Sequence, residues 1–159
     1  SYLVRAKLYP LERNTGCHKC GNSRCFVCQN IKETNTFSSS TTGDTFKINH
    51  FLNCTDKCVI YLLTSKVCKK QYTGKTVDKF RFRWNNYKQS DRKFLKGQDI
   101  KQKFLHQHFS DKEHKGFTQE IEICLIDKTQ SSDPHKREHY WMRKLKTLAP
   151  HSLNTEETY

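Results

Sequence analysis

The chain has 159 residues, of which 34% are hydrophobic. This fits one modest domain, or a small domain with an additional segment that a bound metal ion holds together. The 29 Lys and Arg residues against 16 Asp and Glu residues give a formal net charge of +13, which favours a polyanionic partner such as nucleic acid. A membrane partner is disfavoured, because the sequence has no long apolar run and no strongly amphipathic cationic helix. No signal peptide is visible and residue 1 is a serine, so we expect an excised piece of a longer polypeptide.

The first third of the chain predicts an arm and a cysteine-rich segment. Residues 1–16 are basic and interrupted by proline, which is typical of a linker or arm. Residues 17–57 are cysteine-rich, and the polar run Ser38 to Asp44 predicts a loop between a strand ending at Phe37 and a strand starting at Thr45. Residues 58–154 then form the predicted main domain, and residues 155–159 a tail.

The main domain begins with two predicted strands and a helix. Cys58–Leu63 is rich in β-branched and aromatic residues, and a turn over Ser65–Lys70 leads into a second strand at Gln71-Tyr72. Thr76 is expected to cap a helix that reaches about Gln89, with Asp78 in its first turn. The apolar stripe of this helix consists of Phe80, Trp84 and Tyr87.

Four further segments complete the predicted order. Residues 90–98 read as a polar, lysine-rich loop, and a helix over about Ile100–Phe109 is expected to bury Phe104 and Leu105. Alternation over Gln119–Ile126 predicts a third strand. Asp133-Pro134 is a strong start signal for a last helix, which we expect to reach about Thr147.

Two of the predicted strands carry a tyrosine at or near an end, in Val59-Ile60-Tyr61 and in Tyr72-Thr73-Gly74. This arrangement can bring two phenols to one side of a small sheet, where they can act on a phosphodiester. Tyrosine is common in strands, so the pattern alone is weak. It gains weight from Arg83, Glu138 and the basic charge of the chain.

Glu138 lies on the apolar face of the last predicted helix, near Trp141, Met142 and Leu145. A buried carboxylate needs a cationic partner, and two partners fit the sequence. One is Mg²⁺, and the other is a structural salt bridge to Arg83 or to a lysine.

Arg83 sits on the flank of the apolar stripe, where its planar fork can clamp a phosphate. The alternative for any one arginine here is a position on a solvent-exposed face of the helix, with no role in the site. Other basic residues around this site and in the following loop are expected to contact the nucleic acid, namely Lys75, Arg81, Lys88, Arg92 and Lys93.

The chain resembles the GIY-YIG endonuclease family in the order of five elements: VIY, YTG, Arg83, Glu138 within KREHYWMRKL, and Asn154 within LAPHSLN. It is more closely similar to the endonuclease domain of Penelope-like retroelements, through the runs CGNSRCFVC, TFSSSTTGDTFKI, LNCTDKCVIYLL and QYTGKT. The similarity covers roughly residues 17–154. It implies an α/β (α+β) domain with a small three-stranded antiparallel sheet flanked by helices, preceded by a zinc-binding segment.

The resemblance also implies hydrolysis with a single metal ion, Mg²⁺ or Mn²⁺, held by Glu138. Tyr61 would be, or would assist, the general base, Tyr72 would position water and phosphate, and Arg83 would stabilise the transition state. Asn154 would fix the end of the last helix beside the site. Because a phenol has a pKa of about 10, Tyr61 can act at neutral pH only where nearby cations favour phenolate.

Four positions depart from the family pattern: Val59, Thr73, Tyr87 and Ser152. Tyr87 stands four residues after Arg83, where retroelement relatives commonly have histidine. A tyrosine there can donate a hydrogen bond but cannot take a positive charge, so this change is the one that bears on activity.

The chain has 8 cysteines, and their spacing near histidines favours reduced zinc ligands over disulfides. Cys20, Cys25, Cys28 and Cys54 match the retroelement pattern, and four thiolates can close a structural zinc site. A competing set replaces Cys54 with Cys17. We prefer the set with Cys54.

A second zinc site in the relatives uses a Cys-x-x-Cys and two histidines. Cys68, His108 and His114 match three of those ligands, whereas Ser65 is a poor fourth ligand. The alternative for His108 is a packed core histidine. The remaining histidines considered are expected at the surface or near DNA rather than as ligands, namely His106, His135, His139 and His151.

Three functions fit these observations. The first is a nuclear endonuclease that nicks double-stranded DNA, so that a reverse transcriptase on the same polypeptide can prime copying of retroelement RNA. The second is a non-catalytic zinc module that binds nucleic acid. The third is an RNA-binding arm that stacks bases on Phe80, Phe82 or Trp84.

Overall fold

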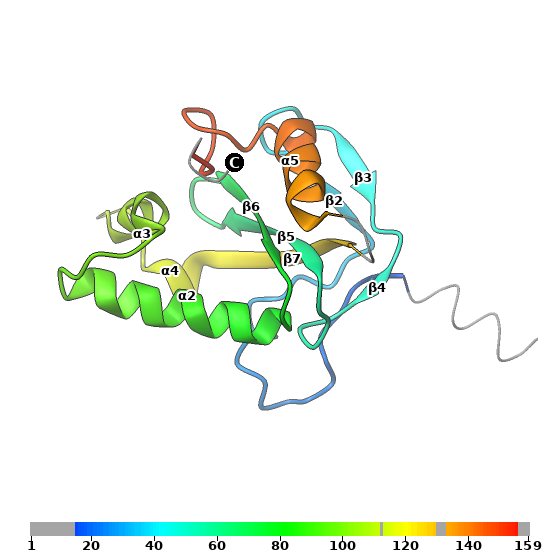
Figure 1. Cartoon of the computed structure of the whole chain (residues 1–159), viewed down its shortest axis with the longest axis horizontal. Helices are drawn as coiled ribbons and strands as arrows, with labels where there is room; N and C mark the ends of the chain where they lie inside the picture. The colour runs from blue at the N-terminus through cyan, green and yellow to red at the C-terminus, as the bar shows by residue number, and fades with distance from the viewer. Residues whose placement is uncertain (1–14, 112, 130–132, 156–159) are drawn as a thin grey trace, which may run out of the picture.

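A computed structural model describes residues 15–111, 113–129 and 133–155 of the chain. Its centre is an antiparallel sheet in the order β6-β5-β7, formed by β5 (Val59–Ser65), β6 (Gln71–Thr76) and β7 (Ile121–Lys128). Helices α2 (Phe80–Leu95) and α5 (Pro134–Leu145) lie on opposite sides of this sheet (Figure 1). The predicted fold class, a small three-stranded antiparallel sheet flanked by helices, is confirmed.

The pairing of β5 with β6 places the two tyrosines on one face of the sheet. Tyr61 pairs with Gly74, and Leu63 pairs with Tyr72. Directly opposed residues of an antiparallel pair lie on the same face, and alternate residues of one strand do so as well. Tyr61 and Tyr72 therefore share a face, as the sequence predicts.

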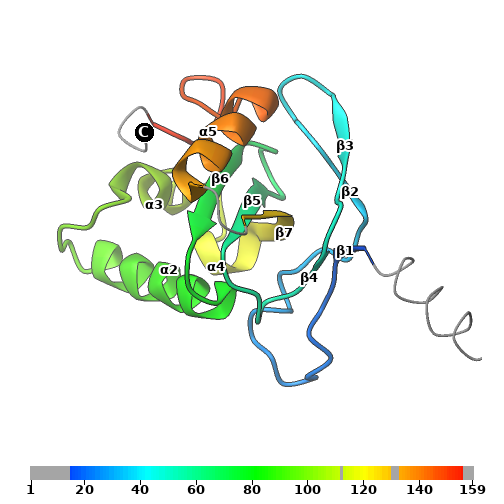
Figure 2. The same cartoon turned by 45° about the vertical axis from the view of Figure 1, so that its right-hand side comes forward.

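The N-terminal segment runs beside the sheet and contributes short strands: β1 (Gly16–Cys17), β2 (Thr36–Ser38), β3 (Thr45–Lys47) and β4 (Phe51–Leu52) (Figure 2). Strands β2 and β3 form the hairpin that the sequence predicts. The predicted arm lies mostly outside the described residues, since residues 1–14 are not described, but Gly16 belongs to β1 and pairs with Phe51 of β4. Residues 156–159 of the predicted tail also lie outside them.

Strand β7 is buried on both faces, whereas the sequence predicts alternation with one apolar face. Cys124 and Ile126 are buried, and so are the apolar residues on the other face of the strand, because the N-terminal segment lies along this strand. The Lys32 amide donates to the carbonyl of Ile123, and the Leu125 amide donates to Sγ of Cys17. The strand also begins at Ile121 rather than Gln119, because a short helix, α4 (Phe117–Glu120), precedes it.

Helix α2 is longer than predicted and begins differently. It continues to Leu95, so the predicted loop over residues 90–98 is wrong in its first part. Thr76 does not cap it, because Thr76 is the last residue of β6 and its hydroxyl donates to the carbonyl of Asp78. Backbone carbonyls of the cysteine-rich segment instead accept from the first amides of the helix, Asp56 from Phe80 and Cys54 from Arg81.

Helix α3 (Lys103–Ser110) packs against α2 through a residue that the sequence places at the surface. His106 is fully buried, and its Nδ1 lies 3.0 Å from Oδ1 of Asp91 in α2. The expectation of a surface or DNA-proximal His106 is therefore wrong. Phe104 was expected in the core but is 48% exposed, whereas Leu105 is buried as predicted.

Helix α5 is held against the sheet and the β2–β3 hairpin. The Asp133 carboxylate accepts from the amide of His135 and caps the helix, as predicted. The helix ends at Leu145, two residues before the expected Thr147, and Lys146 there has a φ of 50°. The indole of Trp141 donates to Asp127 of β7 and packs against Phe37 of the hairpin. These contacts fix the orientation of the helix that carries Glu138.

The helices in residues 15–111, 113–129 and 133–155 are all too short or too polar to cross a bilayer.

Candidate active site and metal-binding clusters

Tyr61 lies in the middle of β5, where Gly74 makes room for its ring. A Cβ atom built on Gly74 would lie 2.5 Å from the Tyr61 hydroxyl oxygen and 2.6 Å from Cε2. Only glycine tolerates such a close approach. The glycine of the second tyrosine motif is thus explained by the ring of the first.

The Tyr61 phenol is fully buried, and two side chains of α2 hold its oxygen. It lies 2.7 Å from the hydroxyl of Tyr87, and Nε of Arg83 donates to it over 3.2 Å. Burial and the neighbouring Tyr87 raise the pKa of Tyr61, and the positive charge of Arg83 offsets only part of this rise. The expectation that nearby cations would favour a Tyr61 phenolate is therefore not met by the protein's own side chains.

A cleft of about 580 Å³ runs along β6 between α2 and α5. Its lining includes three of the predicted catalytic side chains, Tyr72, Arg83 and Glu138. The Tyr72 hydroxyl accepts from Nε2 of Gln102 over 3.1 Å, and burial raises the pKa of Tyr72, with further increases from Tyr61 and Glu138. Tyr61 does not line this cleft. Its hydroxyl contacts Arg83, and Arg83 does line the cleft.

Glu138 points into the cleft although it is only 5% exposed. Its Oε1 lies 3.3 Å from Nζ of Lys75, which is the lysine salt bridge that the sequence left open. Burial raises the pKa of Glu138, and the positive charges of Lys75 and Arg83 counteract that rise. A carboxylate that faces a cleft beside a lysine ammonium is a suitable ligand for a divalent ion.

Asn154 acts on the backbone of the second tyrosine motif. Its Oδ1 accepts from the amide of Thr73 over 2.7 Å, and its Nδ2 donates to the Thr73 carbonyl over 2.9 Å. Its own amide donates to the carbonyl of Thr147, just beyond α5. Asn154 is thus a positioning residue, joining the strand of Tyr72 to the helix of Glu138.

The predicted nucleic-acid contacts lie in different places. Lys75 lines the cleft and binds Glu138, and Lys93 lines a second cleft of about 500 Å³ that also includes Arg83. Arg92 is exposed on α2. Arg81 donates to Sγ of Cys25, and Nζ of Lys88 lies 5.2 Å from the ring centre of Phe26, so these two face the cysteine-rich segment.

A family model, the GIY-YIG catalytic domain, matches residues 57–151. The chain belongs to the GIY-YIG family. Searches of curated proteins and of solved structures gave no match. GIY-YIG domains are typically endonucleases that use divalent metals, and the match includes the predicted catalytic residues except Asn154. The chain is thus of the nuclease type.

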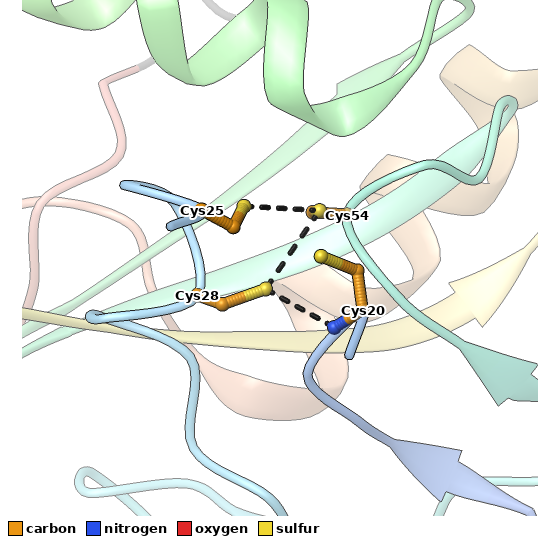
Figure 3. A group of neighbouring side chains, drawn as sticks. All are labelled: Cys20, Cys25, Cys28 and Cys54. Carbon is orange, nitrogen blue, oxygen red and sulfur yellow. Dashed lines mark hydrogen bonds between the residues drawn. The ribbon is translucent and has the colours of Figure 1, made fainter. Parts of the chain in front are cut away.

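Beside this GIY-YIG domain, Cys20, Cys25, Cys28 and Cys54 converge with their sulfur atoms within 4.8 Å of one another (Figure 3). This is the preferred set, and four thiolates are compatible with a structural zinc ion. Cys17 lies elsewhere, with a hydrogen bond to Cys124 that lowers its pKa.

Within this cluster the pKa values of Cys25 and Cys28 are shifted in opposite directions. Burial raises the pKa of Cys28 to about 11. Burial opposes ionisation of Cys25 too, but hydrogen bonds from Cys28, Cys54 and Cys20 hold its pKa at about 6. One thiolate is therefore favoured at the expense of its neighbours, and a bound cation would remove that conflict.

A second cluster of the GIY-YIG domain contains Cys68, His108 and His114, as predicted. Sγ of Cys68 lies 3.2 Å from Nε2 of His108, and burial lowers the pKa of His108, which favours the neutral imidazole that binds metal. Nδ1 of His114 lies 2.6 Å from buried Glu120, a carboxylate contact typical of metal-binding histidines. The Ser65 hydroxyl accepts from two amides of its own turn.

A third cluster was missed by the sequence analysis. His135, Glu138 and His139 place their ligand atoms within 4.8 Å of one another on α5. We had expected both histidines at the surface or near DNA rather than as ligands. The available signal was the position of His135, three residues before Glu138 and four before His139, because residues three and four apart share one face of a helix.

Proposed function

We propose that this domain is a metal-dependent DNA endonuclease that nicks double-stranded DNA by hydrolysis of a phosphodiester. The observation that carries the proposal is the single cleft that gathers Tyr72, Arg83 and Glu138 from β6, α2 and α5. A phenol, a guanidinium and a carboxylate that line one cleft are groups that phosphodiester hydrolysis can use.

Each side chain has a role that follows from its place. Tyr72 orients the attacking water from the cleft wall, and Arg83 stabilises the negative charge that develops on the phosphate. Tyr61 assists the general base that activates the water, through its hydrogen bonds to Arg83 and Tyr87. Glu138 would hold Mg²⁺ or Mn²⁺, which supplies positive charge to the phosphate and leaving oxygen.

The domain's second cleft extends the basic surface. It shares Arg83 and Lys101 with the first cleft and adds Lys93. We infer that the DNA backbone follows both clefts, because successive phosphates along the backbone are neutralised by successive cations.

We further propose that the nick serves a retroelement of the Penelope-like type. The motif order and the four-cysteine set support this, since they resemble that endonuclease domain over roughly residues 17–154. The partners would then be a reverse transcriptase domain on the same polypeptide and the element's RNA, acting in the nucleus. Hydrolysis would leave a 3′ hydroxyl for priming.

The test is nicking of supercoiled plasmid with Mg²⁺ or Mn²⁺. Wild type and Glu33→Ala, a change at an exposed carboxylate, are expected to yield open circles, and Glu138→Ala is not. A DNA polymerase should extend the nicked strand without prior phosphatase treatment. A 3′ phosphate at the nick would contradict the priming role.

The burial of Tyr61 favours a second candidate, a zinc module that binds DNA without cutting it. Salt-dependent binding with no nicking by wild type under either metal would support that candidate and overturn the endonuclease.

A further inference from the structure

Glu138 lines the cleft that the proposed function uses, and His135 and His139 form a cluster with it. His135 lies three residues before Glu138 and four before His139, so that the three residues lie within about one turn of α5, and their ligand atoms lie within 4.8 Å of each other. Glu138 is buried, and both histidines are half-buried. The two imidazole rings lie 4.2 Å apart between their centres.

Lys75 shows that a cation is attracted to this cluster. Its Nζ lies 3.3 Å from Oε1 of Glu138 and 3.3 Å from Nδ1 of His135. A lysine ammonium only donates hydrogen bonds, so Nδ1 of His135 accepts and carries a lone pair. The carboxylate and this lone pair therefore converge on one positive charge.

We propose that His135 and His139 join Glu138 in binding the divalent ion, which makes the site a mixed nitrogen and oxygen site. This inference rests on the proposed function only for the ion's use in DNA cleavage. The ion would replace the Lys75 ammonium, which already lines the cleft and is then available to a DNA phosphate.

The ligand set determines which metal the site prefers. Mg²⁺ prefers oxygen ligands and keeps most of its waters, whereas imidazole suits later first-row metals. Two imidazoles beside one carboxylate thus disfavour Mg²⁺ relative to first-row transition ions, and among these Mn²⁺ shares the preference of Mg²⁺ for carboxylate ligands and serves as the probe ion.

The test is the binding of Mn²⁺ to the full chain that carries zinc in its four-cysteine cluster. Electron paramagnetic resonance serves as the readout. We expect nitrogen hyperfine coupling in the bound Mn²⁺ of wild type. The His135→Ala/His139→Ala variant should lose that coupling and bind Mn²⁺ at least about tenfold more weakly, since even outer-shell partners contribute about that much. Its affinity for Mg²⁺, measured by competition, should change far less.

His151→Ala is the matched control, because His151 is an exposed histidine outside the cluster, and it should bind Mn²⁺ as wild type does. Nitrogen coupling in wild type needs no variant to fold, so its absence overturns the inference. Coupling that persists in the double variant also overturns it, because the nitrogen then belongs to another site.

These results separate the inference from the endonuclease proposal. Histidine-dependent Mn²⁺ binding without nicking would support the metal site and contradict the nuclease. Nicking with Mn²⁺ binding that does not depend on the histidines would do the reverse.

Discussion

Tyr72 and Tyr61 differ in their access to the cleft, and this difference predicts different costs of losing each hydroxyl. Tyr72 lines the cleft, so Tyr72→Phe should lower the nicking rate at least about 100-fold, the scale of acid–base catalysis. Tyr61→Phe removes a bond to Arg83 and should cost about tenfold. Single-turnover nicking measures both, with Tyr140→Phe on the exposed side of α5 as the control. The opposite order would mean that Tyr61 itself reaches the water.

The phenols also predict how activity depends on pH. Burial raises the pKa of Tyr61, Tyr72 and Tyr87 above the usual value, so at neutral pH each phenol is protonated. The phenolate fraction then grows about tenfold per pH unit throughout the range below that pKa. At saturating metal and DNA, the nicking rate should rise in the same proportion from pH 7 to 9 without levelling off. A plateau centred near pH 7 would exclude a phenolate base.

At the scale of strands, the contact of Gly74 with the Tyr61 ring predicts strong coupling between β5 and β6. Gly74→Ala should destabilise the fold and reduce nicking, because the new Cβ meets the ring. In a Tyr61→Ala background the same change should cost much less free energy of unfolding. Denaturation of wild type, both single variants and the double variant gives the coupling energy. Additive costs would show that the ring is not the obstacle.

The strands of the central sheet and helices α2 and α5 follow from local sequence patterns, whereas the errors in their bounds and caps come from tertiary contacts. Residues Ser90 to Lys93 are polar and looked like a loop, yet Asp91 continues α2 because it pairs with buried His106 of α3. Gly97, with a φ of 79°, was the available stop signal. Thr76 looked like a cap, but carbonyls from the distant Asp56 and Cys54 occupy that role.

The candidate site was predictable where the position of a single residue on its helix or strand determines which way its side chain faces. The helical spacing of Glu138 from Trp141 and Leu145 placed its carboxylate on the inner face, and the two tyrosines share a face as expected. Lys75 as the partner of Glu138 was not predictable, because the pair joins residues 63 positions apart. The burial of the Tyr61 hydroxyl was missed for the same reason.

For the whole molecule, the four-cysteine cluster is expected to stabilise the nuclease domain. Cys54 belongs to the cluster, and its carbonyl accepts from the amide of Arg81 in α2. Cys54→Ser should remove a zinc ion and lower the melting temperature by at least about 10 °C, because a structural zinc contributes folding energy. Elemental analysis and thermal melting test this, with Cys58→Ser as the control outside the cluster. An unchanged zinc content in Cys54→Ser would contradict the assignment.

The distribution of charge over the molecule predicts which cations bind DNA. Lys93→Ala should lower the slope of log affinity against log salt by about 0.9, the value for one phosphate contact. Arg81→Ala should leave the slope unchanged, because its guanidinium contacts Cys25. Fluorescence anisotropy at several salt concentrations measures the slopes. Equal losses in both variants would indicate that DNA also covers the cysteine-rich face.

The C-terminal segment has a consequence for how the domain can be shortened or fused. Leu153 donates its amide to the carbonyl of Gln71, the hydroxyl of Ser152 bonds both backbone groups of Gln71, and Asn154 bonds both groups of Thr73. Together they shield the outer margin of β6. Without these three residues that margin would be left as a bare template for strand addition, so a trimmed protein would tend to self-associate through the very strand that carries Tyr72.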